Sequence, residues 1–163
     1  MHDTIHSHGL EKATIEKVRE SLLGLNVGQL DRTHGSMFFL KLGQLSDVEG
    51  SRKAHKRGEW ELLVEAADWV LALPAGGYIT SGDGTRDIDH CFASVKNTPI
   101  DAVTIAPNGH LRLSTASGHI LMTRQADSEF DGLSRWTLYH ADIWCLVCRF
   151  DGSFDAGDPR KIC

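Results

Sequence analysis

The stretch AVTIAPNGHLRLSTASGHILM (102–122) decides the fold class. It holds three short apolar segments, and a Pro-Asn-Gly sequence at 107–109 separates the first from the second. Asn-Gly between segments of alternating polarity is a strong local signal for a β-hairpin, because both residues accept the positive φ of a tight turn. Ser-Gly at 117–118 separates the second segment from the third. The stretch therefore predicts an antiparallel β-meander.

Segments of the same kind lie on both sides of this meander. They are short, rich in aromatic and β-branched residues, and closed by Gly, Pro or polar residues, as strands are. The predicted strands are 37–42, 59–64, 69–73 and 78–80 before the meander, and 136–139 and 143–148 after it. The residues after Asp151 are predicted to form a fading strand and a polar tail.

One amphipathic helix is predicted ahead of the strands, from Leu10 to Leu23. Ser7 is its predicted N-cap, and Gly24 is placed to take the left-handed position after its last turn. Apolar residues recur near one face of a 3.6-residue repeat at Leu10, Ala13, Val18, Leu22 and Leu23.

The order of these elements predicts the fold class. After Leu25 no second amphipathic stretch of helical length follows, so a parallel sheet built from βαβ units is disfavoured. Residues 82–98 read as a loop with a short helix around 89–94, and mark a seam between two β layers. We predict one α+β domain over 1–163: an N-terminal helix, then mostly antiparallel sheet as a sheet pair or half-barrel, with 1–6 and 156–163 as tails.

Composition and charge limit the classes of partner. The 163-residue chain has a formal net charge of -5, which repels phosphate backbones and anionic membranes, so neither nucleic acid nor a membrane is an expected partner. No apolar run approaches the roughly 20 residues that span a bilayer. We expect a cytoplasmic protein whose four cysteines are reduced thiols. The basic run 52–57 is interpreted as a solvated hairpin or Ω-type loop, with a docking patch as the alternative.

An acidic loop is the first place to look for a metal or catalytic site. Asp83, Asp87, Asp89 and His90 lie within eight residues, enough oxygen ligands for a hard cation. The EF-hand pattern fails, because its sixth-position glycine and twelfth-position glutamate are missing. The favoured interpretation is a turn closed by side-chain to backbone hydrogen bonds that enters a short helix.

The spacing of Cys145 and Cys148 is that of half a zinc site or of a redox dithiol. The pair lies in a run of Trp, Ile, Leu and Val that predicts a buried strand, where residues three apart point to opposite faces. We therefore interpret both as inert core cysteines.

The sequence resembles known proteins in two ways, one in the positions of its apolar and aromatic residues and one in the spacing of its strands. The first resemblance, over residues 25–90, is to an uncharacterised family of small bacterial proteins that reads Gly-Glu-Trp-x-Leu-His-Val-Gln-Cys-Pro-Trp-Arg where this chain has Gly58-Glu59-Trp60 and then 61–70. The polar residues of that family pattern are absent here, and the aromatic frame is kept. The matching positions are Leu25, Val27, Gly28, Leu30, Phe38, Phe39, Gly43, Leu62, Val64, Trp69, Ile79 and Gly82.

The second resemblance is to the β-meander of small bacterial immunity proteins, which neutralise toxins. It rests on strand rhythm at 109–113, 118–121 and 135–138. The resemblance implies a binding function without naming a partner.

The sequence shows no catalytic constellation and implies no cofactor, so it does not specify a function. Our hypothesis is a non-enzymatic domain that binds another protein, in its narrowest form an immunity-like inhibitor of a bacterial toxin, since an acidic domain attracts a basic partner. Two alternatives stay open: a small-molecule-binding or metal-dependent enzyme with its site at the acidic loop, and a homo-oligomer with an exposed tryptophan face. The candidate binding residues are Asp83, Asp87, Asp89, Asp127, Glu129 and Asp131.

Overall fold

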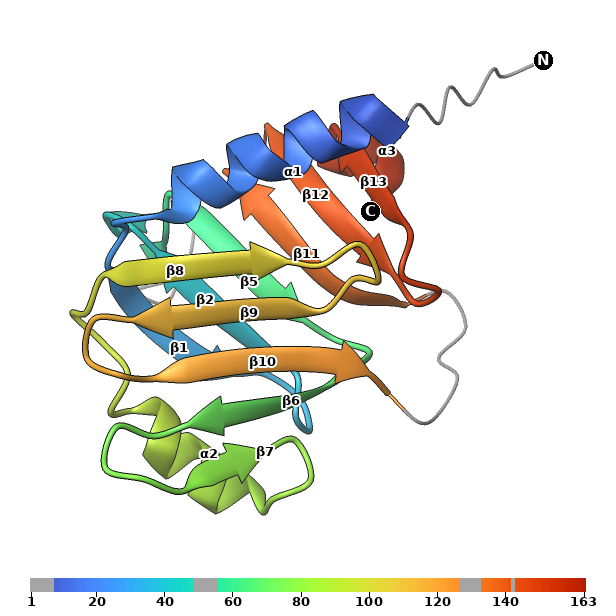
Figure 1. Ribbon diagram of the computed structural model, residues 1–163. Coiled ribbons are helices and arrows are strands. Elements are labelled where there is room, and N and C mark those ends of the chain that lie inside the picture. Colours follow the sequence, from blue (N-terminus) through green and yellow to red (C-terminus); the bar gives the residue numbers. More distant parts are fainter. Residues whose placement is uncertain (1–7, 49–55, 127–132, 142) are drawn as a thin grey trace.

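Two antiparallel sheets packed face to face form the body of the protein (Figure 1). The computed structural model describes residues 8–48, 56–126, 133–141 and 143–163. The predicted fold class is confirmed, because an N-terminal helix precedes a mostly antiparallel pair of sheets.

The first sheet has six strands, each antiparallel to its neighbours. Across the sheet they are β1 (Val27–Arg32), β2 (Phe38–Leu42), β5 (Trp60–Val64), β11 (Ser134–His140), β12 (Trp144–Arg149) and β13 (Phe154–Gly157). The edges of this sheet are therefore β1 and β13.

The second sheet has five strands, again all antiparallel. Across the sheet they are β7 (Tyr78–Thr80), β6 (Ala67–Ala72), β10 (Ile120–Gln125), β9 (Leu111–Thr115) and β8 (Ile100–Ile105). A separate two-stranded ribbon pairs β3 (Ser46–Asp47) with β4 (Lys56–Arg57).

Alternation along the strands builds the core between the sheets. In β5 the side chains of Trp60, Leu62 and Val64 are buried, while those between them are partly exposed. β6 repeats this period of two with Ala67, Trp69 and Leu71, as expected for strands with one face on a core. The inner faces of the two sheets together form one contiguous hydrophobic cluster.

Helices lie against all four edges of the two sheets (Figure 1). α1 (His8–Leu22) packs beside β8, and Gly24, at φ +83°, turns the chain away after the helix and donates its N–H to the Ile100 carbonyl at 2.8 Å. α2 (Thr85–Phe92) lies at the opposite side and contacts both β1 and β7, so it joins an edge of one sheet to an edge of the other. α3 (Pro159–Ile162) follows β13.

Three aromatic rings join the two sheets to α2. Phe38 of β2, Trp69 of β6 and Phe92 of α2 have ring centroids 5.3 Å apart in every pair, and the two contacts of Phe38 are edge-to-face. The indole N–H of Trp69 also donates to the Ser36 carbonyl at 2.8 Å. All three rings are almost completely buried, so this cluster is a junction of three elements.

The β8–β9 hairpin is fastened to the other sheet. Gly109 in its turn has φ +89°, and a Cβ there would lie 2.6 Å from the Cys148 sulfur, so only glycine fits. Trp136 donates its indole N–H to the Gly109 carbonyl at 2.9 Å, and buried Arg135 donates to the Asn108 carbonyl at 2.8 Å. The predicted Asn-Gly hairpin is confirmed, and its turn proves to be a tie between the sheets.

Four expectations differ from the structure in detail. On α1, Val18 and Leu22 are buried and Ile15 is half-buried, whereas Ala13 and Leu23 are exposed. The face that meets the sheets is therefore the one with an i, i+3, i+7 spacing. The strand β1 was not predicted. The short helix of the 82–98 region begins earlier, at Thr85.

Residues 156–163, expected as a tail, form the end of β13 and α3. Ser7 and residues 1–6 lie outside the described residues.

Removing one ring of the aromatic junction should destabilise the fold. We expect Phe92→Ala to lower the free energy of unfolding by about 3–5 kcal/mol, because a large buried ring is lost and a cavity remains. Chemical denaturation measures this change, with Arg86→Ala at an exposed position of the same helix as control. Equal midpoints for the two variants would contradict the assigned role of the junction.

Candidate functional site

The acidic loop forms the turn into α2, as the favoured interpretation predicted. Asp83 follows β7, and its carboxylate accepts the N–H of Thr80 at 2.7 Å and the Thr80 hydroxyl at 3.2 Å. Asp87 lies in the first turn of α2, where its charge suits the helix dipole, and His90 lies in the last turn. Both side chains are exposed. The turn thus uses Asp83 to close its own backbone.

Asp89 is held by an ion pair with the first sheet. Arg32 of β1 donates Nε–H to one carboxylate oxygen of Asp89 at 2.7 Å and Nη2–H to the other at 3.0 Å. These hydrogen bonds lower the pKa of Asp89 below its ordinary value. The pair lines a groove of about 350 Å³ between β1 and α2, which also includes Lys96. Asp89 therefore fastens α2 to β1 and is already engaged.

The geometry of the acidic loop does not support a metal-binding or catalytic site there. Within the described residues, no group of three or more His, Cys, Asp or Glu side chains is arranged to hold a metal ion. The second group of candidate binding residues lies outside the described part of the chain; it comprises Asp127, Glu129 and Asp131.

The two cysteines of the Cys-x-x-Cys sequence point to opposite sides of β12, as predicted. The Cys148 sulfur lies 3.8 Å from the Gly109 carbonyl oxygen, on the side of the second sheet. The Cys145 sulfur instead lies 3.1 Å from the sulfur of Cys163, beyond α3. Both strand cysteines are fully buried, and they do not form a pair with each other.

The outer face of the six-stranded sheet carries a small pocket of about 210 Å³. Its lining includes Phe39, Glu61 and Tyr139, which lie on adjacent strands. Burial raises the pKa of Tyr139 above its ordinary value, and the thiols of Cys163 and Cys145 act in the same direction. Pockets that enclose drug-sized ligands measure about 300–1,000 Å³, so this pocket is small for such a ligand.

The outer face of the five-stranded sheet is covered by none of the described helices or strands. In Figure 1 it faces the viewer, and no described helix crosses it. Two rows of cross-strand neighbours run over it, one through Tyr78, Ala72 and Ile120 and the other through Val70 and Met122. Tyr78 is 70% exposed and Met122 39%. We call these five residues the open sheet face.

Polar residues border the open sheet face. On one side the rows continue through Arg112 and Ser114 of β9, and Ser114 donates its hydroxyl to Asp101 at 2.9 Å. Beyond Met122, Arg124 lies 4.0 Å from Asp68. An apolar centre with a hydrogen-bonded polar rim is the arrangement found in protein–protein interfaces.

The sequence contains a signal for this face that the strand predictions did not use. Since side chains alternate in a strand, buried Leu71, Ile79 and Leu121 imply that their neighbours point outward. Single exposed apolar residues are ordinary, but several of them side by side on one face are informative, and Tyr78 and Met122 lie on the same face as Val70, Ala72 and Ile120. The contact between Cys145 and Cys163 had no comparable signal, because α3 brings together residues that no repeat relates.

A search of protein-family models, of curated proteins and of solved structures finds no match to this chain. The two resemblances drawn from the sequence therefore stay predictions. Within the described residues, no helix combines the length and apolarity needed to cross a membrane.

Breaking the Arg32–Asp89 pair should change the titration of Asp89. We expect Arg32→Ala to raise the pKa of Asp89 toward its ordinary value, because the donors that favour the charged form are lost. NMR titration of the side-chain carboxyl measures this, with Lys96→Ala as a control that removes a charge from the same groove.

The sign of the linked stability change follows from the lowered pKa. The pair stabilises the fold above the unfolded-state pKa of Asp89, and this contribution is lost as pH falls through the folded-state pKa. Arg32→Ala should therefore be less stable than wild type at neutral pH, and the difference should shrink in acid. A difference in stability independent of pH would contradict this account.

Proposed function

We propose that the protein is a non-enzymatic domain that binds another protein on the open sheet face. The observation that carries this proposal is the exposure of Tyr78 and Met122 among apolar neighbours on the outer face of the five-stranded sheet. Large contiguous apolar patches on soluble proteins often mark interaction sites. Tyr, Met and Arg are enriched in interfaces, and the face offers Tyr78 and Met122 beside Arg112.

Secondary structure makes the face rigid. Its five residues lie on β6, β7 and β10, whose opposite side carries core residues such as Leu71 and Leu121. A contact surface that is ordered before binding loses less conformational entropy on association. The open sheet face thus combines an apolar surface with preorganisation.

An immunity-like inhibitor is the narrower form of this proposal. The net charge of -5 would speed the encounter with a basic toxin, and the open sheet face would then make the apolar contact. This form predicts that the partner is a toxic enzyme whose activity falls on binding, and that the association rate falls as salt is added. The enzyme alternative at the acidic loop has less support, since Asp83 and Asp89 are engaged within the fold.

Replacing the exposed apolar side chains should weaken partner binding without unfolding the domain. We expect Tyr78→Ser with Met122→Ser to lower the affinity for a partner at least tenfold, about 1.4 kcal/mol, because residues of this kind dominate interface energetics. A partner captured from cell extract by wild-type protein is purified, and its Kd is measured for wild type and variant.

The matched control is Ile143→Ser. Ile143 is 75% exposed, and it lies in the turn between β11 and β12 of the other sheet. It should leave the Kd unchanged. Equal affinity of wild type and the double variant, or loss of binding in the control alone, would reject the open sheet face. Concentration-dependent self-association through the face would instead favour a homo-oligomer. Such an oligomer would not use the tryptophan face expected from the sequence, because Trp60, Trp69 and Trp136 are buried and Trp144 is half-buried.

A further inference from the structure

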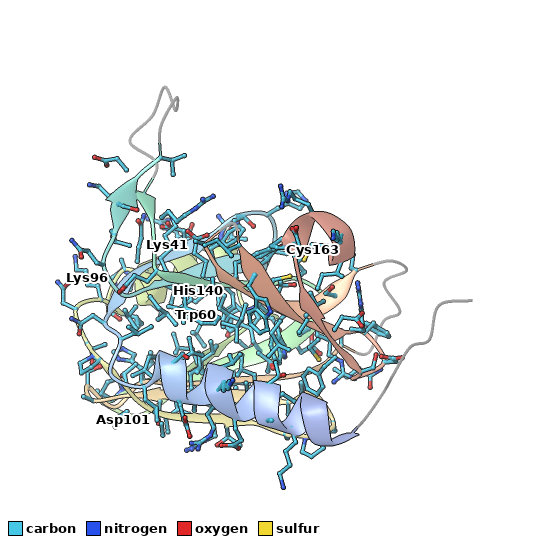
Figure 2. All side chains as sticks on the ribbon, turned by 90° about the horizontal axis from the view of Figure 1, so that it is seen from above. Lys41, Trp60, Lys96, Asp101, His140 and Cys163 are labelled. Carbon is cyan, nitrogen blue, oxygen red and sulfur yellow. The ribbon has the colours of Figure 1, made fainter. Side chains whose placement is uncertain are left out.

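Two cysteines far apart in the sequence meet on the outer face of the six-stranded sheet. The sulfur atoms of Cys145 and Cys163 are 3.1 Å apart. Cys145 is fully buried in β12, whereas Cys163 is exposed beyond the end of α3. Figure 2 shows Cys163 beside the short helical turn at the border of the sheet. One sulfur is therefore protected and the other is open to solvent.

The position of Cys163 is set by polar contacts that do not involve sulfur. Arg149 of β12 donates Nη2–H to the Ile162 carbonyl at 2.9 Å and Nε–H to Asp155 at 2.7 Å. Asp158 caps α3 by accepting the N–H of Arg160 at 3.0 Å. The N–H of Cys163 donates to the Pro159 carbonyl at 3.0 Å. These bonds hold the segment after β13 where the Cys163 thiol meets Cys145.

We propose that Cys145 and Cys163 are a thiol-oxidation site that closes to an intramolecular disulfide when the protein meets a small-molecule disulfide such as oxidised glutathione. A disulfide places its sulfurs about 2.0 Å apart, so the two thiols need to approach by about one ångström. In this proposal the exposed Cys163 makes this small shift, and Cys145, buried in β12, stays in place.

Exposure decides the order of the two steps. Burial, with the Cys163 thiol, raises the pKa of Cys145 to about 12, so Cys145 is the poorer first nucleophile. The thiolate of exposed Cys163 attacks one sulfur of oxidised glutathione. A Cys163–glutathione bond forms, the glutathione S–S bond breaks, and the first glutathione leaves with the proton that Cys163 gave up.

The second step joins the two protein sulfurs. Cys145 attacks Cys163 Sγ, the bond to the attached glutathione breaks, and that glutathione leaves with the proton of Cys145. The protein loses two electrons and two protons, and one oxidised glutathione becomes two reduced ones. The product ties the segment that carries α3 covalently to β12.

The experiment counts thiols and maps the link. Fully reduced protein is treated with oxidised glutathione under native conditions, free thiols are counted after denaturation, and peptides are mapped by mass spectrometry. The expected result is the loss of two of the four thiols, a peptide pair joining Cys145 to Cys163, and return of both thiols with a reductant.

Variants keep the result interpretable. Cys163→Ser, at an exposed position that should leave the fold intact, should form no intramolecular disulfide. Cys145→Ala should keep glutathione attached to Cys163. Cys91→Ser, on α2, is the matched control and should still lose two thiols. A Cys145–Cys148 link, a disulfide-linked dimer through Cys163, or a lasting glutathione adduct on wild-type Cys163 would each overturn the proposal.

Discussion

The contact among Phe38, Trp69 and Phe92 is the constraint on which the rest of the fold depends. Each ring comes from a different element, so the cluster fixes the distance between the two sheets and the position of α2 at once. A pair of packed sheets is open on two sides, and apolar core side chains at these sides would be exposed to water unless another element covered them. α2 closes one side through Phe92 and Ile88, and α1 closes the other through Val18 and Leu22.

A polar tie complements the aromatic junction. Arg135 and Trp136, adjacent on β11, both donate to carbonyls of the β8–β9 turn. Arg135 is only 4% exposed, and a buried guanidinium requires acceptors because leaving it unpaired is costly. Main-chain carbonyls at Asn108 and Phe150 supply them. Apolar packing has no preferred direction and leaves the position of the hairpin over the first sheet free. These hydrogen bonds are directional and therefore fix it.

Most of the strands could be predicted from local signals in the sequence, whereas the contacts between distant residues could not. The Asn-Gly turn is a local rule, and the alternation around Trp60 and Trp69 shows which side chains face the core. The strand β1 could not be predicted because Gly28 and Asp31 have low strand propensity. It forms because its backbone pairs with β2, a tertiary contact that compensates for the low propensity. For the candidate site, the acidic turn at Asp83 was correctly read as backbone closure. Its ion pair across to Arg32 depends on tertiary packing and has no signature in the sequence.

The two outer sheet faces differ for a reason that the strands themselves reveal. β12 is buried on both faces, since the outward side of Cys145 and Val147 is covered, and its sequence is accordingly a continuous apolar run. β10 has one buried face, yet its outward positions still include Ile120 and Met122 where a solvated strand would carry polar residues. On β12 the outward apolar side chains are covered within the chain. On β10 no described element covers them, and the proposed binding surface rests on this difference between the two sheets.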